Sequence, residues 1–592
     1  MQPFKTNDNV GLSQMPKLIK NHPIETIFIK IPALETVKNE LRKSSAYFYS
    51  LRMVETSKWL SELLLAVTDI EEVDNVFYKK YIHENTDEEY CGTQRIETRR
   101  KTDALEDKVL VIKNLLDLRE FKKAAYFAFK DYQKENLDNE ILFYYSYAIY
   151  MHEKLKIEED KMNMKINRTS KNVIISKDLE MIAEILTYHM KRDELSDVNL
   201  YIYALILKER GLYDEALEIF VKILNVNPFF WSAWCELNHI LSNQENIDSL
   251  VVISKINNHW MKNFFSLTIL LENVRTHERY ENYCYDICCG LLAFFSNSSY
   301  LLNLLAVLFH NISDYESSLD FFNKIFFLDP FRSENLDILS NILYVKENQN
   351  DLGKLSLNCF ENNKYCPETC CVLGNYYSLI GDHTKAAVYF KRAINLDRNF
   401  LAAYTLLGHE YLELKNIASA IEAYNDAVQI NSKDFRAWYG LGQAYELQNH
   451  LEFALYYFLQ ALKANPRDSR MWNAVGNCYK KMEKHNVASK CLEKAESLKD
   501  QEGISLFQLG KMYDLLNLQK KAVQCFEENL AKKEENAGID KETSETLLYL
   551  AYYYKNNGDL EKAMQYSSRL LDYSGFEQQE AQMIIQSINM AK

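Results

Sequence analysis

Five glycines recur in this sequence at a constant interval, and an alanine follows each of them twelve residues later. In a chain of 592 residues with only 16 glycines, this register is not a product of chance. Two antiparallel helices can cross closely only where neither carries a bulky side chain, so we predict that each glycine meets the alanine of a second helix. The two columns are Gly374, Gly408, Gly442, Gly476 and Gly510, and Ala386, Ala420, Ala454, Ala488 and Ala522.

Larger side chains complete the repeat. Trp438, Leu441 and Tyr445 form one apolar stripe on the first helix, and Pro466 ends a second helix. The second helices share a ring position at Phe390, Tyr424, Phe458 and Phe526. This W-x2-L-G-x2-Y, A-x3-F and P pattern, together with its constant period, resembles the tetratricopeptide-repeat (TPR) family. We therefore predict an all-α fold, a TPR superhelix or α-solenoid of antiparallel helix pairs.

The register divides the chain into segments. A tail precedes a divergent helical half with two polar insertions, followed by a partly degenerate array, a regular array, a polar loop, and a last TPR with its capping helix. These segments are residues 1–35, 36–195 with insertions near 83–103 and 152–178, 196–299, 300–530, 531–545 and 546–592. The aromatic-rich segment 36–195 is the expected dimerisation region.

Composition excludes several classes of function. The net charge of -14 argues against a nucleic-acid surface and favours basic or neutral peptide partners. No apolar run reaches the length of a membrane span and no signal peptide is apparent, so we expect a soluble intracellular protein. The 12 cysteines include no CxxC pair and are expected to be packing residues. Nothing points to a metal, and we expect no cofactor. No nucleophile, zinc or phosphate-loop motif occurs, which predicts that the chain is not an enzyme.

Segments outside the repeat consensus carry a more specific resemblance. They include LDPFRSENLDILSNILYV (328–345), PETCCVLGNYYSLIGDHTKAAVYFKRAINL (367–396) and NPRDSRMWNAVGNCYKKM (465–482). With these, the chain resembles the subunit-eight (cell-division-cycle-twenty-three type) family of the anaphase-promoting complex. The resemblance implies a non-catalytic scaffold of a multi-subunit E3 ubiquitin ligase in the nucleus and cytoplasm. It also implies a homodimer joined through N-terminal halves, stacked against other TPR subunits of the complex.

The residue after each glycine is predicted to line a concave groove that binds an extended peptide, because it lies opposite the buried stripe. Carboxamides there would hold a peptide backbone, and acids would pair with a guanidinium. The resemblance implies that the ligand is the arginine-containing C box of a coactivator, with Asn375 and Glu410 as its receptor residues. The predicted groove residues are Asn303, Asn341, Asn375, Gln443, Asn473, Asn477, Glu410 and Glu446, with His409 in the same column.

Other functions remain as alternatives: a sister TPR subunit of the same complex, or a TPR adaptor of another assembly. A chaperone-tail adaptor needs a two-carboxylate clamp of Lys, Asn and Arg on successive first helices. Here Asn375 is present, but Cys371 stands where the clamp lysine would be, and Ala402 and Leu406 replace the following basic pair. The clamp is therefore missing.

Overall fold

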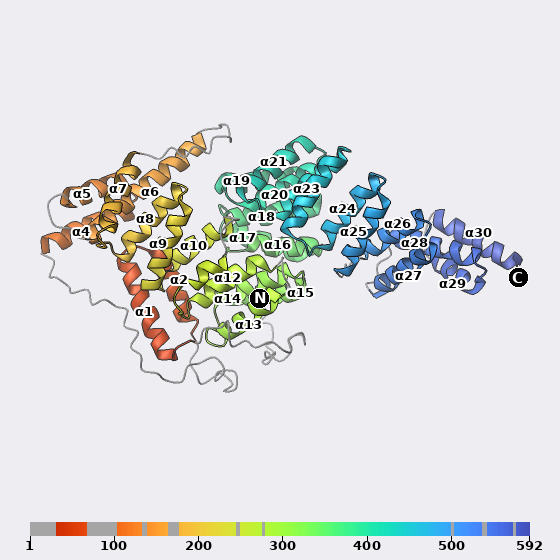
Figure 1. Ribbon diagram of the computed structural model, residues 1–592, viewed down its shortest axis with the longest axis horizontal. Helices are drawn as coiled ribbons and strands as arrows, with labels where there is room; N and C mark the ends of the chain where they lie inside the picture. The colour runs from red at the N-terminus through yellow and green to blue at the C-terminus, as the bar shows by residue number, and fades with distance from the viewer. Residues whose placement is uncertain are drawn as a thin grey trace. The chain divides into compact units, whose positions relative to one another are not determined.

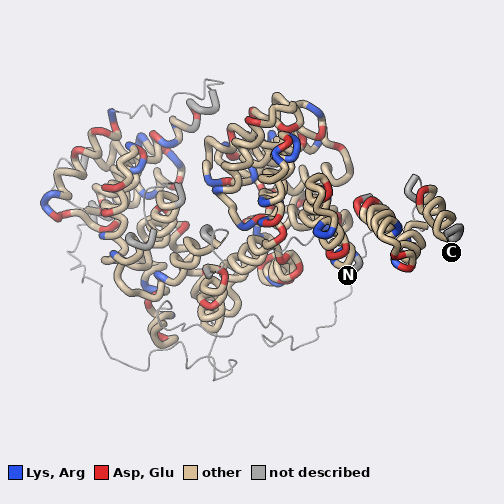
Figure 2. The backbone as a smooth tube through the Cα atoms, turned by 45° about the vertical axis from the view of Figure 1, so that its right-hand side comes forward, with Lys and Arg blue, Asp and Glu red and all other residues tan. Residues whose placement is uncertain are grey.

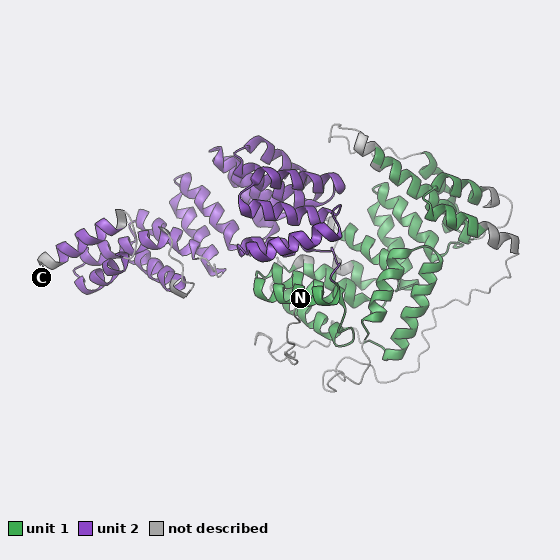
Figure 3. Cartoon of the chain, turned by 180° about the vertical axis from the view of Figure 1, so that it is seen from behind, with its two compact units in different colours: residues 1–329 green, residues 330–592 purple. Residues whose placement is uncertain are grey.

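The computed structural model describes residues 31–67, 103–132, 139–163, 177–243, 249–274, 279–498, 503–535, 541–571 and 576–591. These residues fold into α-helices joined by short turns (Figure 1), which confirms the predicted all-α TPR solenoid. The chain forms two compact units, Met1–Asp329 and Pro330–Lys592 (Figure 3). The helix pair that follows residue 298 belongs to unit 1, because it packs on the helices before it.

In unit 1, the N-terminal helices fold back onto a helix of the later repeats. Trp59 stacks on Trp231 with ring centroids 3.8 Å apart, and the Thr56 and Ser232 hydroxyls are hydrogen-bonded at 2.6 Å. The helices of this unit are α1 (Leu34–Ser50), α2 (Val54–Leu65), α4 (Asp103–Asp117), α5 (Phe121–Tyr132), α6 (Asn139–Asn163), α7 (Lys177–Met190), α8 (Asp197–Glu209), α9 (Tyr213–Val226), α10 (Trp231–Asn243), α11 (Ser249–Ser254), α12 (Lys262–Asn273), α13 (Arg279–Leu292), α14 (Ser299–Asn311) and α15 (Tyr315–Leu328).

Unit 2 holds the regular repeats. Each first helix packs on its own second helix, and the second helix packs on the first helix of the next repeat. The last helix, α30, buries Ile584 and Ile588 against Ala551 and Ala563 and thereby covers the open end of the array. The helices are α16 (Leu336–Val345), α17 (Gln349–Asn362), α18 (Pro367–Ile380), α19 (His383–Leu396), α20 (Leu401–Glu413), α21 (Ile417–Ile430), α22 (Phe435–Leu447), α23 (Leu451–Ala464), α24 (Ser469–Lys481), α25 (His485–Ser497), α26 (Ile504–Leu515), α27 (Gln519–Glu535), α28 (Lys541–Asn556), α29 (Leu560–Leu570) and α30 (Phe576–Ala591).

The nearest neighbours of the repeat glycines are large apolar side chains of the second helix, mostly aromatic rings, and not the side chains of the alanines. A methyl group on Gly442 would lie 2.5 Å from the ring of Phe458, and one on Gly510 would lie 2.6 Å from Phe526. The alanines of the predicted column are fully buried, but the groups nearest the glycines belong to residues sixteen positions later. The predicted glycine–alanine contact is therefore corrected to a contact with a large apolar side chain that extends across the crossing. This side chain is Leu492 at Gly476 and an aromatic ring at the other four glycines.

The connections between helices also repeat. Trp438 and Trp472 each donate the indole N–H to the backbone carbonyl six residues earlier, at 2.8 and 2.9 Å. These bonds fix the turn before each first helix. The turn after each first helix contains one residue of positive φ at the same position of the repeat, in the conformation that commonly terminates helices. These residues are Ser313, Glu347, Gly381, Lys415, Asn449, Glu483 and Asn517.

Two predicted polar insertions are partly helical. α6 continues to Asn163 and α7 begins at Lys177, so much of 152–178 is helix. α27 continues to Glu535 and α28 begins at Lys541, which leaves little of the predicted loop 531–545. Lys and Glu are good helix formers, and Lys533 bonds Glu542 at 3.0 Å across the gap. The insertion near 83–103, apart from Asp103, lies outside the described residues.

Charged residues of both signs are interspersed over the helices of each unit (Figure 2). None of the described helices combines the length and the hydropathy that a membrane crossing requires.

Candidate peptide-binding site

The first helices of unit 2 form one layer. α16, α18, α20 and α22 contact one another in succession, while no comparable contact joins successive second helices in the described part of this unit. The first helices therefore lie on the more tightly curved side of the array, where side chains of several repeats converge. These four helices carry the predicted groove residues of unit 2 except Asn473 and Asn477, which lie on α24.

Asn375 lies at the start of a polar network in this layer. Its side chain is only 2% exposed, and its Nδ2 donates to Ser340 Oγ and to Asn341 Oδ1, both at 2.8 Å. Adjacent repeats thus join their carboxamides directly, so Asn341 and Asn375 act as a pair and not as separate surface groups.

Glu410 lies in the same layer. Its side chain is 7% exposed and accepts hydrogen bonds from Ser378 Oγ at 2.7 Å and from His383 Nδ1 at 2.9 Å. Burial raises the pKa of Glu410, while the bonds from Ser378 and His383 act in the opposite direction. No Lys or Arg of the described chain bonds this carboxylate, so its negative charge is held by a hydroxyl and an imidazole.

The remaining predicted residues are in different situations. Asn473 is buried, and its Oδ1 has no hydrogen-bond partner among the described residues. Gln443 and Asn477 are half-buried, and Glu446 is paired with Lys481 at 2.8 Å, which occupies the carboxylate that was expected to meet a guanidinium. Asn303 is buried in α14, which belongs to unit 1 and is not part of the first-helix layer of unit 2.

His409, in the predicted column, is bonded to Tyr424 within its own repeat. Its Nδ1 lies 2.8 Å from the hydroxyl, and burial lowers the pKa of His409 to about 4. The imidazole is therefore neutral near pH 7 and provides a polar but uncharged group beside Glu410.

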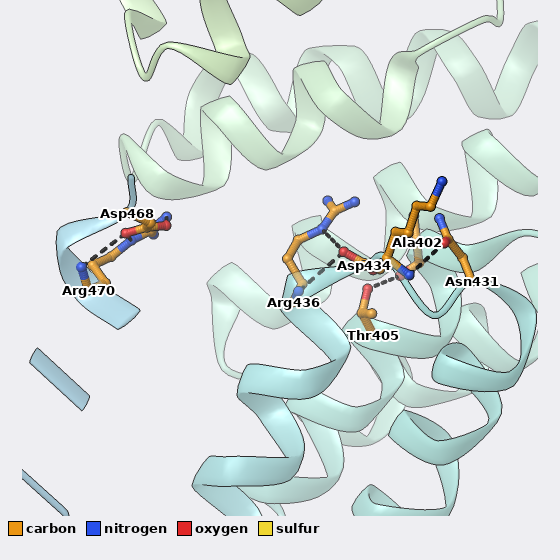
Figure 4. Close-up of polar contacts among 8 residues, drawn as sticks. Ala402, Thr405, Asn431, Asp434, Arg436, Asp468 and Arg470 are labelled. Atoms are coloured by element: carbon orange, nitrogen blue, oxygen red, sulfur yellow. Dashed lines mark hydrogen bonds and ion pairs between the residues drawn. The ribbon is translucent and has the colours of Figure 1, made fainter. Parts of the chain in front are cut away.

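Sequence analysis missed a pair of Asp-x-Arg elements that begin α22 and α24 (Figure 4). Asp434 accepts from the backbone N–H of Arg436 and from its Nε, both at 3.2 Å. Asp468 binds Arg470 in the same way, at 3.0 and 3.1 Å. The signal was present, because the two pairs are separated by the same interval as the repeat glycines. Each aspartate caps its helix and fixes the direction of an arginine.

Arg436 brings positive charge into this layer. The arginine lowers the pKa of Asp337 on α16, although burial raises it more strongly. The same guanidinium also contributes to the low pKa of His409. The layer therefore combines a buried acid at Glu410 with a cation at Arg436.

Most of the described cysteines are buried, as expected of packing residues, whereas Cys235 is exposed. Cys288 and Cys371 are fully buried, and burial raises the pKa of both thiols well above the ordinary value. They are protonated at neutral pH and hence poor metal ligands or nucleophiles.

The helix pairs, their register and their buried columns define a TPR protein. Models of the tetratricopeptide repeat match residues 367–400, 408–449, 435–468 and 469–502. The crystal structure of the APC/C hetero-tetramer Cut9-Hcn1 contains a similar fold, with a TM-score of 0.52 at 18% identity, over 82% of this chain and 96% of that chain. This likeness concerns the fold alone.

The family is more specific than the repeat. A family model described as anaphase promoting complex subunit 8 / Cdc23 matches residues 36–306. Anaphase-promoting complex subunit 8 of Arabidopsis thaliana is 40% identical over 489 residues, which is 82% of each chain. The subunit 8 of Dictyostelium discoideum is 44% identical over 68% of this chain and 67% of its own length. This chain belongs to the anaphase-promoting complex subunit 8/Cdc23 family.

A sister subunit also matches, but over less of the chain. Subunit 3 of the anaphase-promoting complex of Schizosaccharomyces pombe is 36% identical over 19% of this chain. The short match reflects a few shared repeats, and it does not support the sister-subunit alternative.

Proposed function

We propose that this chain is a non-catalytic TPR scaffold subunit of the anaphase-promoting complex, a multi-subunit E3 ubiquitin ligase that controls mitotic progression. It assembles with other TPR subunits of that complex in the nucleus and cytoplasm. The observation that carries this proposal is the similarity to plant subunit 8 over 82% of both chains. A solenoid suits the role, because each added repeat extends the binding surface without needing a larger core.

The first-helix layer of unit 2 is the proposed receptor for a coactivator C-box peptide. A buried carboxylate with no Lys or Arg partner has a charge that a peptide guanidinium can neutralise. Glu410 is such a carboxylate. The half-buried Asn341 has a carboxamide that can bond the peptide backbone, and the buried Asn375 holds it in place through their hydrogen bond. Arginine is preferred over lysine, because its planar donors bind a carboxylate in two places.

The test is binding of a C-box peptide to the full chain and to Glu410→Gln, which keeps the shape of the side chain and removes its charge. Loss of a charge-assisted bond costs roughly 1.5–3 kcal/mol, so affinity should fall about ten- to hundredfold. Glu452→Gln is the matched control, since Glu452 is exposed on α23, a second helix outside this layer. Unchanged affinity of Glu410→Gln would remove Glu410 from the site, and no binding to the wild-type chain would refute the peptide receptor.

We also propose that the chain forms a homodimer through residues of roughly 36–195. On α5, Tyr126 and Phe127 are 64% and 44% exposed, whereas Phe121, Tyr144 and Tyr145 are buried in the core. Two adjacent exposed rings are an apolar surface of the kind that twofold interfaces cover.

A further inference from the structure

A second hollow lies in the last repeats of unit 2, on helices that the C-box proposal does not use. It has a volume of about 460 Å³ and lies between α24, α26, α27 and α28. Its apolar lining comes from Phe507, Leu515, Phe526, Leu548, Tyr549 and Tyr552. Leu515 and Tyr552 are 54% and 37% exposed, so apolar surface in this hollow is open to solvent. Cavities of this size hold small ligands or a few side chains.

Four charged residues border the hollow, and three of them have charged or hydroxyl partners. Lys511 is paired with Glu545 at 2.7 Å and also lies 4.1 Å from the ring centroid of Phe507. Asp514 accepts a hydrogen bond from Tyr549 at 2.7 Å. Both acids at this border are therefore already bonded, and the apolar lining remains between them.

Lys480 differs from the other three. Its Nζ donates to the neutral amide oxygen of Gln508 at 3.3 Å, and no carboxylate of the described chain bonds it. Burial lowers the pKa of Lys480, and the neighbouring Lys511 adds to this shift. A carboxylate from a binding partner would give Lys480 the acidic partner that the described chain does not supply.

We propose that this hollow docks an extended segment of a partner protein in which an aromatic or long aliphatic side chain lies next to an aspartate or glutamate. The apolar side chain fills the space between Phe507, Phe526 and Leu548. The carboxylate pairs with Lys480, which replaces its weak bond to Gln508 by a charge-assisted one. This site therefore selects a negatively charged peptide residue, whereas Glu410 is expected to bind a positively charged one.

A library of nonapeptides with acetylated and amidated ends, selected on the full-length chain, is the probe. Counter-selection uses Leu515→Asp, which places a negative charge on an exposed residue of the lining. We expect the remaining peptides to share an apolar residue beside an acid. The proposal would be overturned if no peptide bound the wild-type chain more tightly than Leu515→Asp. It would also be overturned if the selected peptides contained no acidic residue.

The selected peptide is then measured against two charge-reversal variants whose folding is verified by circular dichroism. Lys480→Glu should weaken binding tenfold or more, and a peptide with lysine in place of its acid should recover affinity for this variant. Lys490→Glu makes the same charge change on the exposed face of α25 and should leave affinity unchanged. Equal losses in both variants would refute a specific pair at Lys480. Glu410→Gln should bind this peptide normally, which separates the outcome from that of the C-box proposal.

Discussion

Gly442→Ala tests the corrected packing of the repeat. The added methyl group would lie 2.5 Å from two atoms of the Phe458 ring and 2.9 Å from a third, where ordinary carbon contacts are about 3.5–4.0 Å. Phe458 is fully buried, so its ring has no free space into which to move. Overpacking of this kind costs about 1–3 kcal/mol. Replacing glycine by alanine inside a helix also stabilises the helix by about 1 kcal/mol, because alanine has the higher helix propensity. The net destabilisation should therefore be up to about 2 kcal/mol.

Gly353→Ala separates these two contributions. Gly353 is also inside a helix, α17, but a methyl group there would approach only the edge of Tyr376, at 3.3 Å. Tyr376 is half-buried and can shift, so the gain in helix propensity of up to about 1 kcal/mol should dominate. Since the propensity gain cancels in the comparison, the difference between the two variants measures the overpacking at Phe458.

Hydrogen exchange followed by mass spectrometry is the suitable assay, because a repeat array opens locally and not in one transition. Amides of α22 and α23 should exchange faster in Gly442→Ala, by up to about thirtyfold for about 2 kcal/mol, while those of α17 should be slowed or unchanged in Gly353→Ala. If α22 and α23 of Gly442→Ala exchange as slowly as in the wild-type chain, the glycine is not needed to accommodate the ring.

Two further predictions concern the binding site and the dimer. Burial raises the pKa of Glu410, and only the ionised carboxylate pairs with a guanidinium. As the pH is lowered, C-box affinity should therefore begin to fall while the pH is still above the ordinary glutamate pKa of 4.5. Glu410→Gln should lose this pH dependence in a fluorescence titration, whereas a dependence kept by the variant would assign it to another group. Tyr126→Asp with Phe127→Asp should convert the dimer to a monomer in light scattering, while Tyr365→Asp, 70% exposed in unit 2, should not. A wild-type chain that is monomeric at micromolar concentration would exclude the dimer.

The constant period of the glycines was sufficient to predict the fold, since a helix pair of fixed length must bury its stripe against its neighbours. It could not identify the group nearest each glycine. Phe390 and Tyr424 were recognised as a ring column, but whether the alanine or the ring approaches Gly374 or Gly408 depends on the crossing geometry.

The turns were also beyond sequence reasoning. Only Gly381 signals the positive φ that recurs after each first helix from Ser313 to Asn517, because the other repeats adopt it with Lys, Glu, Asn or Ser. In the binding layer, the column of carboxamides was visible in the sequence, but not the burial of Asn375 or the bonds of Glu410 to Ser378 and His383. Those bonds join different helices, and sequence spacing within one repeat does not reveal them.

One register connects the two proposed sites. The column that contains Asn341 and Asn375 continues through Lys511, and after the seven-residue insertion it reaches Tyr552. Lys511 and Tyr552 line the hollow between α24 and α28. In a solenoid the same position of each repeat faces the same side, so a substitution changes the local chemistry without moving the surface. Carboxamides in the early repeats suit a peptide backbone, and a lysine at the same position later suits an acid. Exchanging the chemistry of the half-buried members of the column, such as Asn341 and Lys511, should therefore alter which peptide binds at each end.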